Sequence, residues 1–126
     1  METWDRLTKL DILDGRMTSG SKPLSEHLAD FRQSLLDKGG TLGHADTKSA
    51  RALRIVDGCG FRFFSDILPG KAVRFLADER KAGMSVQTSN HYLTAFKGFC
   101  RWMVRERRAT DSPVAHLSGL NAIPFN

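Results

Sequence analysis

Four stretches of the chain place apolar residues three and four positions apart, the spacing that gathers them on one face of an α-helix. The predicted helices cover roughly residues 24–38, 44–58, 69–82 and 86–107. Glycines stand at the ends of the first three, and Pro69 suits the first position of the third. Ser85 is a predicted N-cap of the fourth. The pattern therefore predicts an all-α fold.

The apolar stripes of these helices predict a single shared core. We expect it to contain Leu28, Phe31, Leu35, Ile55, Leu76, Leu93, Phe96 and Cys100, with Val73 on the apolar side of the third helix. The aromatic run 61–64 resembles a strand, but the chain offers no second strand to pair with it. We interpret this run as a packed connection within a four-helix bundle.

The distribution of breakers along the chain predicts one folded unit. Residues 1–22 form a predicted flexible lead-in that ends in a Gly/Ser/Pro-containing stretch. The helical domain is expected over 23–120, with a turn at 111–113 and one more short turn at 114–117. Residues 121–126 show no pattern and are interpreted as a tail.

The formal net charge is +5, and much of it falls on one side of the fourth helix. On a wheel of about 100° per residue, one narrow sector opposite the apolar stripe contains Asn90, Thr94, Lys97, Arg101, Arg105 and Arg108. Like charges four residues apart cost about 0.2–0.5 kcal/mol per pair. Such a face therefore indicates a polyanionic partner, the alternative being a solvated cationic surface that binds nothing.

A smaller version of this face occurs on the second helix. Cations neutralise phosphates, whereas Thr and Asn donate to phosphate oxygens or contact base edges. We therefore predict DNA contacts from Thr47, Arg51, Arg54, Thr88, Asn90, Thr94, Lys97 and Arg101. Lys97 and Arg101 are expected to hold phosphates, and Thr88 and Asn90, near the helix start, to approach base edges.

The stretch 85–102 reads SVQTSNHYLTAFKGFCRW. Its Ser, Thr, Asn, Leu, basic, Phe and Arg-Trp positions are in register with the last long helix of the core-binding domain of phage integrases, the tyrosine recombinases, which it resembles. The segments 65–67 and 111–117 resemble the entrance to that domain's third helix and its exit. The likeness covers about residues 24–120. It departs at Leu68, where a Ser or Thr cap is usual, and at Arg51, where an aromatic is common.

This resemblance implies a four-helix orthogonal bundle of the SAM-like type. Such a domain straddles the duplex DNA of a recombination site, while a separate C-terminal domain cleaves and rejoins the strands. The resemblance further implies that copies of the protein assemble on DNA, and that the setting is the cytoplasm of a bacterium, with a bacterial or phage gene. In the family the second and fourth helices face the major groove, and these are the two helices whose wheels are basic.

The residue types required for chemistry point to a domain without catalytic residues of its own. The family's nucleophilic tyrosine lies in the C-terminal domain, whereas Tyr92 falls beside the apolar stripe and is predicted to pack there. The four histidines are scattered, and Cys59 and Cys100 lie in separate apolar stretches. We expect reduced thiols, no metal and no cofactor. No apolar run is long enough to span a bilayer, and the N-terminus lacks the pattern of a secretory signal.

Two other functions remain open. One is an independent DNA-binding regulator with a helix-turn-helix, although the fourth helix is long for a recognition helix. The other is a helical protein-interaction module with an acidic partner. A duplex-binding assay separates these classes.

Overall fold

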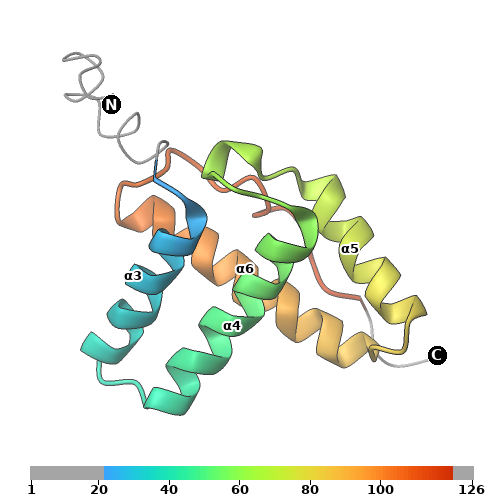
Figure 1. Ribbon diagram of the computed structural model, residues 1–126, viewed down its shortest axis with the longest axis horizontal. Coiled ribbons are helices and arrows are strands. Elements are labelled where there is room, and N and C mark those ends of the chain that lie inside the picture. Colours follow the sequence, from blue (N-terminus) through green and yellow to red (C-terminus); the bar gives the residue numbers. More distant parts are fainter. Residues whose placement is uncertain (1–21, 121–126) are drawn as a thin grey trace.

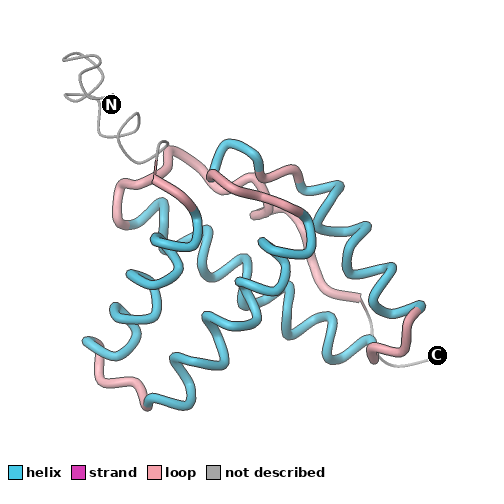
Figure 2. Tube along the Cα trace, in the orientation of Figure 1, coloured by secondary structure: helices cyan, strands magenta, loops and turns pink. Residues whose placement is uncertain are grey.

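The computed structural model describes residues 22–120, and this part of the chain is built from helices without strands (Figures 1 and 2). The elements are α3 (Leu24–Asp37), α4 (Leu42–Cys59), the short 3-10 helix η1 (Phe64–Asp66), α5 (Pro69–Lys81) and α6 (Val86–Arg105). The all-helical prediction is confirmed for these residues. The predicted lead-in, except Lys22, and the predicted tail lie outside them.

The two longest helices, α4 and α6, cross at the centre of the molecule (Figure 1). In the view of Figure 1, α6 passes behind α4, with α3 on one side and α5 on the other. Both α4 and α6 contact each of the other three helices. The residues that face inward from this pair therefore form the middle of the core.

Local sequence explains where the helices begin and end. The Thr41 hydroxyl accepts a hydrogen bond from the His44 amide, so α4 starts at Leu42, two residues before its predicted start. The predicted cap Ser85 likewise accepts from the Thr88 amide. Helix α6 ends at Arg105 instead of Arg107, because Arg107 adopts a left-handed φ of 60° and turns the chain.

The core follows the predicted stripes closely. The buried residues include Leu28, Phe31, Ile55, Leu76, Leu93, Phe96 and Cys100, while Leu35 is partly buried and packs against them. Rings from α3 and α6 meet inside it: the Phe31 centroid lies 5.4 Å from that of Phe99 and 5.4 Å from that of Trp102. Burying side chains of this size contributes about 1.5–3 kcal/mol each.

One apolar assignment was wrong. Val73 was placed on the inner side of α5, but it is 48 % exposed. Helix α5 reaches the core through Ala72 and Leu76, which are buried, and Phe75, which is partly buried. Val73 therefore lies at the edge of the apolar stripe of α5, outside the core.

Helices α4 and α5 approach each other closely at Gly58. A Cβ atom at this position would lie 2.2 Å from Cε1 of Phe75. The ring therefore rests directly on the backbone of α4, and a side chain larger than that of glycine would displace it from this position. This contact determines how near α5 comes to the central helix pair.

Candidate nucleic-acid interface

The outer face of α6 carries exposed polar and basic side chains. Thr94, Arg101 and Arg105 are all exposed, and none forms a side-chain hydrogen bond or ion pair with residues 22–120. The 20 residues of α6 include no Asp or Glu. Part of the predicted cationic face is thus present on the surface without a local counter-charge.

The start of α6 is arranged around its cap. Thr88 is exposed, and its hydroxyl accepts a hydrogen bond of 2.9 Å from the hydroxyl of Ser85. Its backbone amide donates to the same Ser85 oxygen at 3.0 Å. Thr88 therefore lies at the exposed N-terminal turn, where the free amides of a helix favour an anion.

Asn90 and Lys97 lie on the same helix but are half-buried beneath the C-terminal segment. Asn90 forms hydrogen bonds with both backbone polar groups of Leu120, and Lys97 donates to the carbonyl oxygen of Leu117. Lys97 and Arg101 also line a shallow groove with Ser112 and Ala115, where the returning chain passes them. Sequence reasoning missed these contacts, because the segment has no periodic pattern.

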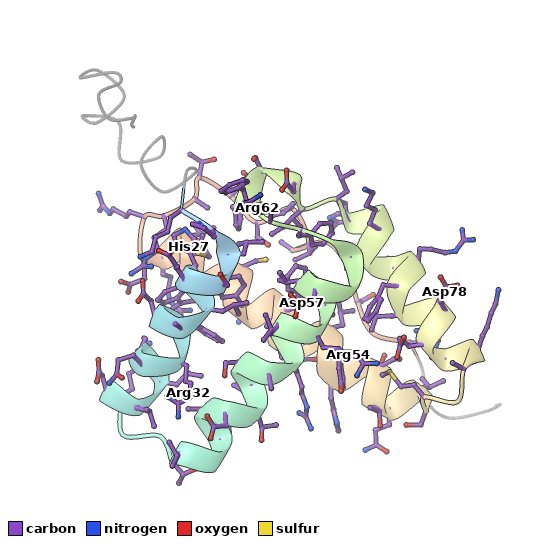
Figure 3. All side chains as sticks on the ribbon, in the orientation of Figure 1. His27, Arg32, Arg54, Asp57, Arg62 and Asp78 are labelled. Atoms are coloured by element: carbon purple, nitrogen blue, oxygen red, sulfur yellow. The ribbon has the colours of Figure 1, made fainter. Side chains whose placement is uncertain are left out.

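The second helix contributes Thr47, Arg51 and Arg54, which share a side of α4 in the wheel. Thr47 is exposed, Arg51 is half-buried, and neither forms a side-chain hydrogen bond or ion pair within the described range. Arg54 differs, since its Nη2 lies 2.6 Å from Oε1 of Glu79 on α5 (Figure 3). Of the two arginines, only Arg54 has an ion-pair partner among residues 22–120.

Arg108 does not belong to the α6 face, which corrects the sequence-based wheel. The wheel assumed that the helix continues to this residue, but the chain turns at Arg107. The Arg108 guanidinium instead lies 4.6 Å from the centre of the Trp102 ring, and its Nη1 is 2.7 Å from Asp30 and 3.1 Å from Nδ1 of His27. It joins the end of α6 to α3.

Asp30 is the centre of this junction. Its carboxylate accepts hydrogen bonds from Lys22 and from Arg108, each at 2.7 Å. These bonds, with that from Lys22 the largest contribution, lower the pKa of Asp30 from its usual value of 3.8. The carboxylate of Asp30 therefore lies between two cations and balances part of their charge.

The tyrosine and the two cysteines lie partly or fully buried in the helical bundle. Tyr92 packs partly buried against the core, as predicted. Both cysteines are free; burial raises the pKa of Cys100 to about 12 and also raises that of Cys59. Over residues 22–120, no three His, Cys, Asp or Glu side chains are grouped as metal ligands.

Comparisons with known proteins found no matching family model and no matching curated protein or solved structure. No described helix has the length and hydropathy needed to cross a membrane. The fold and the surface therefore define the described residues as an all-helical domain whose longest helix presents cations without a carboxylate partner. A more specific assignment depends on the sequence of that helix and on its surface residues.

Proposed function

We propose that this chain binds duplex DNA through α6 and α4, as the core-binding domain of a tyrosine-type site-specific recombinase. The four helices would form the orthogonal, SAM-like bundle of that family. Strand cleavage and rejoining would belong to a separate C-terminal domain. This proposal combines the resemblance of residues 85–102 with the surface chemistry of the two central helices.

The observation that carries the proposal is the charge balance of α6. Lys97, Arg101 and Arg105 recur at four-residue steps on a helix without acidic residues. Helix stability alone would favour interspersed carboxylates there, because like charges at this spacing repel. A DNA backbone supplies a regular row of anions along its length, so phosphates are the counter-charge that this face lacks.

Within this proposal the side chains divide into two roles. Arg101, with Arg51 from α4, neutralises phosphates, and Thr94 and Thr47 donate hydrogen bonds to phosphate oxygens. Thr88 and Asn90 lie in the first turn and a half of α6, the part of a recognition helix that contacts base edges. Binding by this domain alone is expected to be weak, because the family's grip on DNA uses two domains.

The test is a salt titration of duplex binding with an arginine-matched control. Arg101→Ala should weaken binding to cognate and random duplexes alike, and should lower the slope of log K against log salt by about one unit. The control is Arg74→Ala on α5, whose side chain is 78 % exposed. This variant removes the same charge from a different helix, at a position where the arginine pairs with Asp78. It should therefore change the affinity for DNA little.

If Arg101→Ala binds as tightly as the wild type at every salt concentration, the α6 face is only a solvated surface. Absence of duplex binding together with tight binding of an acidic protein would favour the interaction-module alternative. A nicked DNA substrate should yield no covalent adduct with this chain, because Tyr92 packs against the core. A phosphotyrosine linkage at Tyr92 would contradict the proposed division between two domains.

A further inference from the structure

The C-terminal segment returns along α6 and covers part of the face assigned to DNA. In Figure 1 the red end of the chain runs back from the end of α6 toward its start. Ser112 and Ala115 pass beside Arg101, and Leu117 packs partly buried against the core. We call residues 117–120 the C-terminal strap.

Asn90 holds the end of this strap with both polar atoms of its side chain. Its Nδ2 donates to the carbonyl oxygen of Leu120 at 2.6 Å, and its Oδ1 accepts from the Leu120 amide at 2.8 Å. The side-chain amide thus pairs with the backbone as a neighbouring strand would. Three residues before Leu120, the carbonyl oxygen of Leu117 accepts from Lys97.

The strap and a DNA duplex therefore need the same atoms. An Asn side chain presents a bidentate edge to a base with the same amide nitrogen and oxygen that Leu120 occupies. Lys97 has its ammonium directed to a backbone carbonyl, away from a phosphate. A duplex seated on the start of α6 would have to replace these bonds.

We propose that the C-terminal strap regulates the DNA face by competing with the duplex for Asn90 and Lys97. This inference rests on the proposed function. In the strapped state, Arg101, Arg105 and Thr94 remain exposed for sequence-independent contact, while the base-reading position is closed. Because coupling is reciprocal, DNA that engages Asn90 should release the strap to the same degree that the strap weakens DNA binding.

Gly119 offers a way to open the strap without substituting any residue of the predicted DNA contact. A Cβ atom at this position would lie 2.8 Å from both Cγ and Oδ1 of Asn90. In Gly119→Ala, either the backbone moves away or the Asn90 side chain rotates, and each response breaks the paired hydrogen bonds. Gly119 is exposed, so the helical core is left intact.

Gly119→Ala should bind cognate duplex about three- to tenfold more tightly than the wild type, the gain expected when two competing hydrogen bonds are removed. The matched control is Gly70→Ala, since a Cβ there meets nothing within 4 Å. In an Asn90→Ala background the strap has already lost this partner, so Gly119→Ala should add no further change. Amide hydrogen exchange at Leu120 reports strap opening independently of DNA.

The outcomes separate this inference from the proposed function. If the wild type binds duplex DNA and Gly119→Ala binds equally while its Leu120 amide exchanges freely, competition by the strap is wrong and DNA binding stands. Tighter duplex binding by Gly119→Ala while its Leu120 amide stays protected would also overturn the inference, because the affinity would then rise without strap opening. If neither protein binds duplex DNA at low salt, the proposed function fails, and regulation by the strap fails with it.

Discussion

Basic side chains at the α3 end of the molecule and along α6 have opposite surroundings. At the α3 end, Lys22 and Arg108 share Asp30, and Arg32 lies 2.5 Å from Asp46 across the gap to α4. Along α6, Arg101 and Arg105 have no carboxylate partner among residues 22–120. Lys22, Arg32 and Arg108 are thus paired with carboxylates by the fold, whereas Arg101 and Arg105 are left for solvent or a ligand.

This difference shows why net charge alone says little about a binding surface. The formal charge of +5 counts all cations equally. Exposed ion pairs such as Arg32–Asp46 contribute at most about 1 kcal/mol to stability, but they cancel the field on their side of the molecule. The charges of Arg101 and Arg105 on α6 are not cancelled in this way, and unpaired cations on a surface attract a polyanion to it.

The largest expected effect is a loss of stability when one of the cations paired with a carboxylate is removed. Arg108→Ala should lower the free energy of unfolding by about 2 kcal/mol, because it deletes charge-assisted hydrogen bonds and the contact over Trp102. Urea unfolding measures this loss. Duplex affinity should stay unchanged apart from the small general effect of one lost charge.

Arg107→Ala is the matched control, since Arg107 is exposed and forms no side-chain hydrogen bond or ion pair with the described residues. It should leave stability within about 0.5 kcal/mol of the wild type. If Arg108→Ala instead weakens DNA binding and leaves stability unchanged, Arg108 belongs to the DNA-binding face, as the helical wheel predicted. The distinction between paired cations near α3 and unpaired cations on α6 would then be wrong.

A smaller effect is expected at Arg54, which the sequence assigns to DNA and the structure pairs with Glu79. Glu79→Gln frees the guanidinium and should tighten duplex binding about twofold beyond the control, the size expected for loss of one exposed ion pair. The control Asp78→Asn removes one negative charge from the neighbouring residue of α5, where it pairs with Arg74. Equal affinities for the two variants would show that Arg54 does not reach DNA.

A further small effect is the pH dependence of stability that Asp30 contributes. Because Lys22 and Arg108 lower the pKa of Asp30 in the folded protein, its contribution to stability is present above the unfolded pKa near 3.8. It is lost as the pH falls through the lower, folded pKa. The side chain is 41 % exposed, so solvent keeps the effect below about 1 kcal/mol.

Unfolding free energies of the wild type and Asp30→Asn, measured from about pH 6 to about pH 2, isolate this contribution. The difference between the two proteins should shrink toward the acid end. A difference that is independent of pH would mean that the carboxylate charge plays no part in the junction.

The helices and their core could be predicted because their signals are local. Apolar spacing and the cap Ser85 act within a few residues, and the predicted bounds of α4 and α6 agree with the structure to within two residues. The Thr41 cap, which was not predicted, accounts for the earlier start of α4. The helical wheel placed Arg108 wrongly because a wheel assumes that the helix continues without interruption. A single left-handed residue at Arg107 ends the periodicity on which the wheel depends.

The C-terminal strap could not be predicted because its contacts are between residues far apart in the sequence. Asn90 and Leu120 are 30 positions apart, and Lys97 and Leu117 are 20 positions apart. His27 is similar: it is 1 % exposed and faces Arg108, 81 positions later. Such polar pairings leave no repeating pattern, so composition and periodicity carry no trace of them.

The contact between Gly58 and the Phe75 ring has an evolutionary consequence. The Cβ atom of any larger residue at 58 would overlap the Phe75 ring, so either the ring shifts or a smaller residue replaces it. In a randomised library, residues larger than glycine at 58 should therefore be enriched beside residues smaller than phenylalanine at 75. Substitutions at the two positions would then be correlated, although the positions lie on different helices and are 17 residues apart.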